Sequence, residues 1–237
     1  MNSVPRPTRS PDGPPCGPRI GVLVVDDHPA VRSGVTRLLA DQPDLTVIAE
    51  ASTAIAAVDA ATPDVDVAVV DYHLGDRTGL WLVRRLSQLT SPPRILVYSA
   101  FTDDALAVAA TVAGAEGLLS KSAIGEELCL AVRRLAGGGR YLPAISAPVA
   151  RAMGARVDLR LRPIFAMLTQ DISTARIQAA LGISRADLDA ARDAMLAMLA
   201  PAGRGRWRAT APAALDYDRT RPRWRSAAQP SDCHEAR

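Results

Sequence analysis

From about residue 20 to residue 136, short apolar runs alternate with stretches in which apolar residues recur at helical spacing. The runs have the length of strands and are nearly continuous, which is typical of strands buried on both faces of a parallel sheet. The expected strands are 19–25, 45–49, 66–70, 94–98 and 117–120.

The stretches between these runs predict helices, because their apolar residues recur mostly three or four positions apart. These residues are Val31, Val35, Leu38 and Leu39; Leu80, Leu82, Val83 and Leu86; Ala105, Val108, Ala109 and Val112; and Leu128, Leu130, Val132 and Leu135. Strand and helix alternate five times, which predicts a doubly wound (βα)5 α/β domain with a parallel sheet over residues 19–136.

Polar residues follow the expected strands where each strand ends. They are Asp26, Asp27, Asp71, Ser99 and Lys121. In a doubly wound sheet the carboxyl ends of the strands form the crevice in which ligands bind. Lysine occurs once in the chain, whereas the other 27 of the 28 basic residues are arginines. A compact ammonium suits a tight site rich in oxygen atoms, such as one that holds a phosphoryl group.

Three carboxylates gathered at one crevice repel one another and call for a cation. Hard oxygen ligands of this kind suit Mg²⁺, which also coordinates phosphate oxygens. Asp71 is then a candidate nucleophile towards a phosphoryl group, with Lys121 and the metal neutralising the transferred oxygens. Ser99 would offer its hydroxyl to one of those oxygens. A transition-metal site at His28 and His73 is the weaker alternative, because neither has a second His or Cys at ligand spacing.

Simpler structural roles also exist for single members of this set. A strand-end aspartate is most often the N-cap of the next helix, and Asp27 before Pro29 fits that role. Ser99 could belong to a turn. The functional interpretation depends on all five residues meeting at the ends of the correct strands.

This constellation resembles the receiver domain of bacterial two-component response regulators, which has the CheY-like fold. The resemblance covers residues 20–136 and rests on Asp26-Asp27, Asp71, Gly79 eight residues beyond it, Ser99-Ala100 and Lys121. The segments 24–32 and 71–76 are similar to those of the NarL/FixJ subfamily.

The resemblance implies a role for each site residue. Asp71 would accept a phosphoryl group from a histidine kinase. Asp27, Asp71 and the backbone carbonyl of His73 would ligate Mg²⁺, with Asp26 acting mostly through water. Lys121 would pair with Asp71 and Ser99 would be the switch hydroxyl. In this family a homodimer often forms through the face that corresponds to residues 103–135.

Two positions depart from the subfamily pattern. Leu118 stands three residues before the lysine, where an aromatic residue is usual. The coupling in which that ring turns inward as the hydroxyl moves is therefore absent in its usual form. Gly75 stands where the loop after the phosphoacceptor usually carries a proline, a change that does not touch the chemistry.

A second, all-α domain is expected after a glycine-rich linker, 137–145, and would span 146–200. Ser173 is a suitable N-cap, Gly182 makes a tight turn, and Ser184 caps the following helix. Residues 157–199 resemble the LuxR-type helix-turn-helix output domain. Pro163 implies that the first helix of that region starts late, near residue 162.

The helix expected to read DNA carries an unusual charge. Arg185, Asp187, Asp189, Arg192 and Asp193 give it a net charge of −1. Acidic side chains would be repelled by DNA phosphates. Two hypotheses therefore stay open: a transcription regulator that binds DNA through the helix-turn-helix, and a DNA-binding-deficient output domain that binds a protein partner.

An enzyme is a third class, but it is weakly supported. A phosphatase of the haloacid dehalogenase type has a second Asp two residues after the nucleophile, and here that position is His73. We therefore expect that the chain is not an enzyme.

The two ends of the chain carry its basic character. Residues 201–237 have a net charge of +4 and residues 1–19 of +2; because the whole chain carries +3, residues 20–200 are left with −3. We expect a disordered Pro-rich leader, 1–18, and a disordered basic tail, 201–237. The alternative for the tail is that its arginines contact DNA phosphates.

Composition favours a cytoplasmic protein. Cys16, Cys129 and Cys233 suggest neither a disulfide framework nor a zinc site. No apolar run approaches the length of a membrane span, so we expect no membrane partner.

Overall fold

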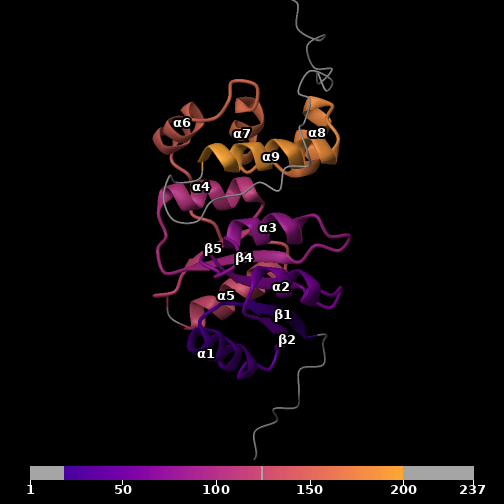
Figure 1. Ribbon diagram of the computed structural model, residues 1–237, viewed down its shortest axis with the longest axis vertical. Helices are drawn as coiled ribbons and strands as arrows, with labels where there is room; N and C mark the ends of the chain where they lie inside the picture. The colour runs from indigo at the N-terminus through magenta and orange to yellow at the C-terminus, as the bar shows by residue number, and fades with distance from the viewer. Residues whose placement is uncertain (1–18, 124, 200–237) are drawn as a thin grey trace, which may run out of the picture.

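The computed structural model describes residues 19–123 and 125–199. A five-stranded parallel sheet with the order β2-β1-β3-β4-β5 forms the centre of the first half (Figure 1). Its strands are β1 (Ile20–Val25), β2 (Leu45–Ala51), β3 (Val67–Asp71), β4 (Arg94–Ser99) and β5 (Gly117–Ser120). The predicted doubly wound fold is confirmed, and each strand lies within two residues of its expected position.

Helices cover both faces of the sheet. They are α1 (Pro29–Ala40), α2 (Ala54–Ala60), α3 (Gly79–Ser87), α4 (Asp104–Ala113) and α5 (Gly125–Ala136). One apolar core joins the sheet to α1 and α5, and a second joins its other face to α2, α3 and α4. The continuous apolar runs arise because β1, β3 and β4 are flanked by strands on both edges and by helices on both faces.

Four further helices follow the sheet domain. They are α6 (Ala147–Ala155), α7 (Arg162–Thr169), α8 (Thr174–Leu181) and α9 (Arg185–Leu199). As expected from Pro163, α7 begins at Arg162. Ser173 caps α8 by accepting a hydrogen bond from the backbone N–H of Arg176, and Gly182 adopts the left-handed conformation with φ of 62°. The turn between α8 and α9 is therefore the predicted one.

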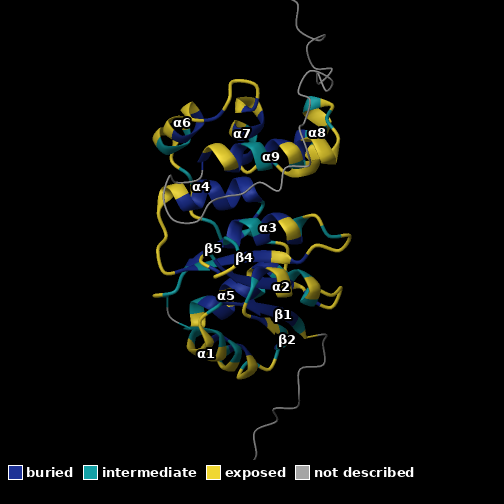
Figure 2. Cartoon of the chain, in the orientation of Figure 1, coloured by how far each residue is buried: buried dark blue, intermediate teal, exposed yellow. Residues whose placement is uncertain are grey.

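The outer surface of α4 is covered by the C-terminal helices. Every residue from Leu106 to Ala113 is buried, so this part of α4 is covered around its whole circumference. Figure 2 shows this helix dark blue along most of its length, between α9 on one side and α3 on the other. Met153, Phe165, Leu188 and Met195 of the C-terminal helices belong to the same apolar core as α4.

The segment expected to act as a linker is partly fixed to the sheet. The backbone N–H of Tyr141 donates to the carbonyl of Glu116, and the N–H of Leu118 donates to the carbonyl of Tyr141. The Tyr141 hydroxyl also donates to Glu127 of α5 over 2.8 Å. Residue 141 thus extends the pairing at the outer edge of β5.

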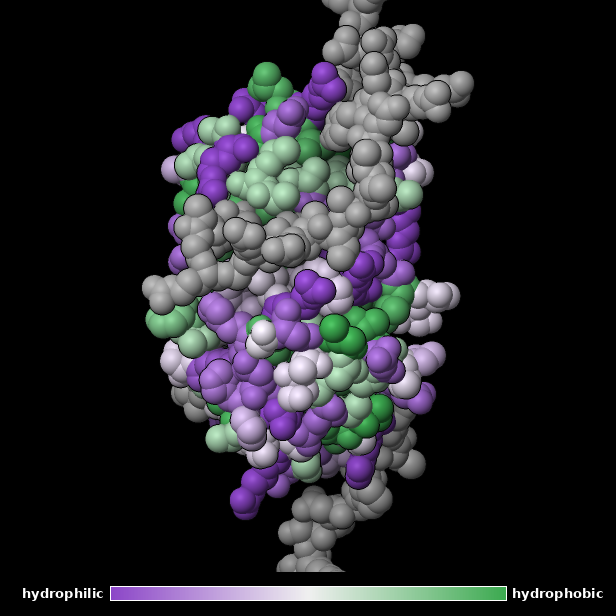
Figure 3. All heavy atoms as spheres, in the orientation of Figure 1, coloured by the Kyte–Doolittle hydropathy of each residue, from purple (hydrophilic) through white to green (hydrophobic). Residues whose placement is uncertain are grey.

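Polar residues occupy much of the exposed surface. Large apolar side chains that remain exposed are scattered, with Phe101 and Leu159 the most exposed of them. The face drawn in Figure 3 shows small hydrophobic groups among hydrophilic residues. Among the described residues, no helix is both long and apolar enough to cross a membrane. The expected leader and tail lie outside the described residues.

Candidate functional site

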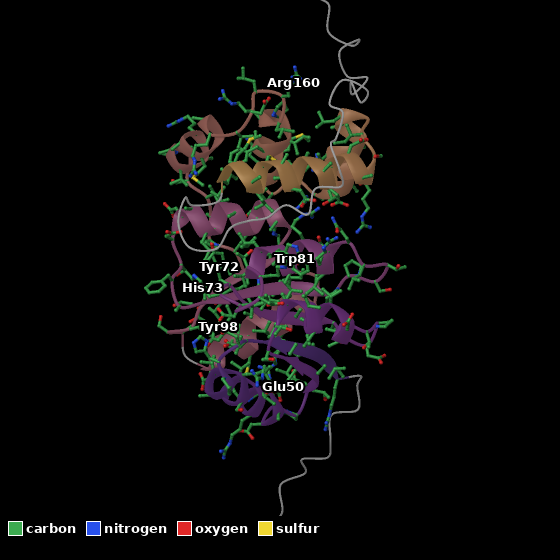
Figure 4. The ribbon with its side chains drawn as sticks, in the orientation of Figure 1. Glu50, Tyr72, His73, Trp81, Tyr98 and Arg160 are labelled. Carbon is green, nitrogen blue, oxygen red and sulfur yellow. The ribbon has the colours of Figure 1, made fainter. Side chains whose placement is uncertain are left out.

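The polar residues predicted to meet do lie at the carboxyl ends of neighbouring strands. Asp26 and Asp27 follow β1, Asp71 is the last residue of β3, Ser99 is the last residue of β4, and Lys121 follows β5. The order β1-β3-β4-β5 makes these strands consecutive neighbours. Figure 4 shows His73 and Tyr98 near this same edge of the sheet.

Lys121 joins two of the carboxylates. Its Nζ lies 2.7 Å from Oδ2 of Asp26 and 2.8 Å from Oδ2 of Asp71. Both aspartates are buried, with 3% of each residue exposed, whereas 17% of the lysine side chain is exposed. The ammonium is therefore the counter-charge for two buried anions.

Backbone N–H groups hold the other oxygens of the same two carboxylates. The N–H of His28 donates to Oδ1 of Asp26 over 2.8 Å, and the N–H of His73 donates to Oδ1 of Asp71 over 3.3 Å. Each carboxylate is thus fixed through both oxygens, which sets its orientation before any ligand arrives.

Burial dominates the protonation of Asp71. It raises the pKa of Asp71 above the ordinary value, while the hydrogen bond and charge of Lys121 lower it and the charge of Asp26 raises it further. Burial acts to lower the pKa of Lys121, but its hydrogen bonds with Asp26 and Asp71 outweigh this and leave that pKa raised. The ammonium is therefore held in its charged form.

The acidic residues have the donor set and the spacing that a divalent cation requires. Ligand atoms of Asp26, Asp27, His28 and Asp71 all lie within 4.8 Å of one another. Oδ1 of Asp27 is buried. Nδ1 of His28 lies 2.7 Å from it, but the geometry of this contact is not that of a hydrogen bond. An anionic oxygen left in this state fits a metal ligand, and carboxylate oxygens suit Mg²⁺.

The His73 side chain takes no part in this cluster. Its ring meets Tyr72 edge-on with centroids 4.6 Å apart. The part expected for its backbone carbonyl as a metal ligand stays a prediction.

The loop that follows Asp71 leaves no room for a side chain at Gly79. A Cβ built there would lie 2.2 Å from the carbonyl oxygen of Asp71 and 2.8 Å from Cα of Tyr72. The N–H of Gly79 donates to the carbonyl of Tyr72 over 2.7 Å. The start of α3 is therefore pressed against the backbone that carries the candidate phosphoacceptor.

Ser99 is fully buried and turned towards the loop before α4. Its Oγ donates to the carbonyl of Phe101 over 2.8 Å and accepts from the N–H of Phe101 at 3.3 Å. The Phe101 side chain is 78% exposed, whereas Leu118, which stands where an aromatic residue is usual, is buried. A change in the direction of this hydroxyl would act first on the loop that leads into α4.

Two neighbouring residues were not identified from the sequence. Asp76 accepts hydrogen bonds from the backbone N–H groups of Ala54 and Ile55, and so caps α2 from the loop after β3. Arg32 donates to the carbonyl of Asp26 over 2.7 Å. The sequence does show an acidic residue, Asp76, in the loop after a strand. It could not show that this residue caps α2, because Ala54 and Ile55 lie more than 20 positions away along the chain.

Comparison with known proteins agrees with this geometry. Residues 22–133 match the model of the response regulator receiver domain. The transcriptional regulatory protein UhpA of Salmonella typhimurium is 38% identical over 168 residues, a match that covers 70% of this chain and 84% of UhpA. The chain belongs to the NarL/FixJ-type response regulators. This assignment confirms the family predicted from the strand-end residues.

Other relatives support the same assignment. The DNA-binding transcriptional activator DevR/DosR of Mycobacterium tuberculosis is 38% identical over 141 residues, covering 57% of this chain and 64% of that protein. A solved LuxR-family response regulator from Aurantimonas sp. SI85-9A1 is 32% identical with a TM-score of 0.50, covering 56% of this chain and 94% of that one. These matches connect the chain with regulators of transcription.

Proposed function

We propose that this response regulator is switched by phosphorylation of Asp71. A carboxylate oxygen of Asp71 attacks the phosphorus of a phosphohistidine on a histidine kinase, the new O–P bond forms, and the N–P bond breaks with return of the imidazole to the kinase. The observation that carries this proposal is the buried Asp71 carboxylate, held by the Lys121 ammonium beside two further aspartates.

The neighbouring residues have distinct parts in this proposal. Asp27, Asp71 and the carbonyl of His73 would hold Mg²⁺, with Asp26 contributing mostly through water, and the ion would supply positive charge to the phosphoryl oxygens. Lys121 pairs with a phosphoryl oxygen once the charge of the Asp71 carboxylate is lost in the acyl phosphate (mixed anhydride). Ser99 leaves the carbonyl of Phe101 and donates to another phosphoryl oxygen.

A small phosphodonor with Mg²⁺ tests this step without the kinase. Intact-mass measurement should show one phosphoryl group on the wild-type chain and none on Asp71→Asn. Asp104→Asn, which removes an exposed carboxylate from the first turn of α4, is the matched control and should be labelled like wild type. Labelling of Asp71→Asn at the wild-type level would refute the assignment.

The first candidate for the output is direct binding of DNA through the helix-turn-helix. Its support is the family: UhpA and DevR/DosR are named as regulators of transcription, and DevR/DosR as DNA-binding. On this candidate the chain acts in the cytoplasm on promoter DNA and is not an enzyme with an external substrate.

The second candidate is an output domain that no longer binds DNA and acts on a protein partner. A specific observation favours it: Asp189 and Asp193 of α9 form ion pairs with Arg84 of the receiver. The helix that would enter the groove of DNA thus carries acidic residues, and they are directed at the chain's own receiver.

A salt titration of binding to promoter-sized duplex separates the two candidates. The full chain and a chain ending at residue 200 should be compared, because the basic residues 201–237 can bind phosphates on their own. Direct DNA reading requires that the shortened chain bind duplex at low salt and lose affinity as salt rises. If it shows no binding at low salt, the first candidate fails and the second stands.

A homodimer is a further possible assembly. The family face, residues 103–135, includes α4, but the outer surface of α4 is covered here by the C-terminal helices. A dimer of this chain would therefore use β5 and α5, or would displace those helices.

A further inference from the structure

The helix expected to read DNA lies against the receiver. Figure 1 shows α9 running alongside α4, with α3 beneath, and residues of α4 and α9 are in contact. We propose that α9 is a permanent partner of the receiver, held by Arg84 through Asp189 and Asp193, and that it stays there whether or not Asp71 is loaded. The inference goes beyond the proposed function and favours its second output candidate, because a docked α9 cannot enter the groove of DNA. It does not require Asp71 to accept a phosphoryl group.

Arg84 is the centre of this contact. It belongs to α3 and is only 3% exposed, and all three of its guanidinium nitrogens donate hydrogen bonds. Its Nε donates to Oδ1 of Asp193 over 2.8 Å, and its Nη2 donates to Oδ1 of Asp189 over 2.9 Å. Nη1 donates to Oγ of Ser87 over 3.1 Å and to the carbonyl of Ala113 over 3.4 Å. A planar fork that meets two carboxylates in this way is a directional contact.

A second guanidinium reaches the same place from the opposite direction. Arg192 of α9 is 7% exposed and donates to the carbonyl of Val112, at the end of α4, over 3.0 Å. Its other terminal nitrogen donates to Oγ1 of Thr174 over 3.3 Å. Burial lowers the pKa of Arg192 to about 10, with the nearby charge of Arg84 adding to the effect. Two cations therefore stand at the C-terminus of α4, where the helix dipole favours positive charge.

The end of α4 is shaped to receive Arg192. Gly114 follows the helix with φ of 105°, a conformation that suits glycine. A Cβ at this position would lie 2.9 Å from Nη1 of Arg192. The glycine thus both ends the helix and leaves space for a side chain from α9.

The apolar character of α4 requires a cover. A surface helix normally has a polar outer face, but α4 is buried from Leu106 to Ala113 with α9 and its neighbours in place. Departure of α9 would expose this apolar surface to water and would leave the acidic residues and the buried Arg84 apart. Both effects oppose release.

Two features outside the charge cluster hold the C-terminal helices near the receiver. Nη2 of Arg185, the first residue of α9, donates to the carbonyl of Ser87 over 2.7 Å. Tyr141, in the segment that joins the two parts, is hydrogen-bonded on both sides to the outer edge of β5. A freely swinging linker would lack such pairing.

The same acidic residues explain the charge of α9. Basic side chains on a DNA-reading helix increase its affinity for DNA, because phosphate contacts supply much of the binding free energy. Asp189 and Asp193 would oppose such contacts, but they are the anions that a buried Arg84 requires. A ligand shifts a conformational equilibrium only by its differential affinity for the two states, and the aromatic coupling residue is replaced by Leu118. On this proposal, the free energy from loading Asp71 is too small to offset the exposure of α4 and the separation of Arg84 from Asp189 and Asp193, so α9 stays in place.

Amide hydrogen exchange on the full chain tests the inference, with and without Mg²⁺ and beryllofluoride as a phosphoryl analogue. Amides of α9 and of the second half of α4 should keep the same protection in both conditions. Arg84→Met should raise exchange in α9 by about tenfold or more, and the double variant Asp189→Asn with Asp193→Asn should do the same from the other side. Arg85→Met is the matched control: Arg85 is exposed on the same helix and stacks on Trp81, 5.3 Å from the ring centroid.

The outcomes separate this inference from the proposed function. Faster exchange in α9 when beryllofluoride protects residues 71–79 would overturn the permanent contact, as would wild-type exchange in α9 of both charge variants. If beryllofluoride leaves residues 71–79 unchanged, the proposed function of Asp71 fails, and the charge variants alone decide the inference.

Discussion

The ammonium of Lys121 donates a 2.7 Å hydrogen bond to Oδ2 of Asp26 and lies 2.8 Å from Oδ2 of Asp71. The sequence predicted the second of these contacts and not the first. Because one cation serves two buried anions, its loss or its movement affects both at once. A cation bound between the aspartates would compete with Lys121 for the same oxygens.

Lys121→Met should therefore destabilise the protein. It leaves two buried carboxylates without their cation, and we expect a loss of about 3 kcal/mol in the free energy of unfolding, as for a buried ion pair that loses one partner. Mg²⁺ should restore part of this loss, because the metal supplies charge to the native site and binds it preferentially. Urea unfolding with and without Mg²⁺ measures both effects.

Lys121→Arg is the companion variant for this prediction. It keeps the charge but replaces a compact ammonium with a wide fork, so its unfolding midpoint should fall between those of wild type and Lys121→Met. Equal midpoints for all three chains without Mg²⁺ would contradict the role assigned to the lysine.

Asp71→Asn should stabilise the fold near neutral pH. Because burial raises the pKa of Asp71 above its unfolded value, ionisation of this carboxyl costs native-state stability, and the neutral amide removes that cost. The cost is complete above the raised pKa, shrinks as pH falls through it, and is absent below the unfolded value of 3.8. Urea midpoints of variant and wild type should differ most near neutral pH and converge in acid. A difference that does not change with pH would contradict the assignment.

Gly79→Ala should damage the site through the backbone. Its Cβ would lie 2.2 Å from the carbonyl oxygen of Asp71, so the loop must move, and we expect a loss of about 1–3 kcal/mol. Phosphoryl labelling of Asp71 should fall as well. Gly34→Ala on α1 is the matched control, because nothing lies within 4 Å of its Cβ. That variant should gain about 0.5–1 kcal/mol, and equal effects of the two variants would refute the argument.

The two buried arginines of the α4–α9 contact should differ in their importance. Arg84→Met leaves Asp189 and Asp193 without their partner, and we expect a loss of about 1–3 kcal/mol. Arg192→Met leaves neutral oxygens unpaired but also removes the cost of a buried charge. Its loss in unfolding free energy should be smaller. Thermal or urea unfolding of both variants checks the order, and a larger loss for Arg192→Met would contradict it.

Local pattern was sufficient to predict the sheet and the position of the site. Continuous β-branched runs marked β1, β3 and β4, and the polar residues at their ends lie together at one edge of the sheet, as predicted. The resemblance then assigned roles to Asp71 and Lys121. These inferences work because a parallel strand buried on both faces leaves a simple trace in the sequence, and because its end determines where the next side chain lies.

The contacts between distant segments were not predictable in this way. Arg84 and Asp189 are 105 positions apart, and nothing near either residue indicates the other. The acidic character of α9 was visible and indicated weak DNA binding, but not the partner of those acids. The one available signal was α4 itself, whose sequence from 104 to 113 has almost no polar residue for an outer face. A helix with so few polar residues requires a cover on its outer side, although its sequence does not indicate which segment provides it.

The covered α4 has a consequence for how this regulator can diversify. Regulators built from separable parts can exchange one effector for another by recombination at the linker. Here, replacing everything after a junction between residues 137 and 146 would expose the apolar surface of α4 to water. A foreign effector domain would have to bury that surface in the same way. The two halves of this chain should therefore be inherited together.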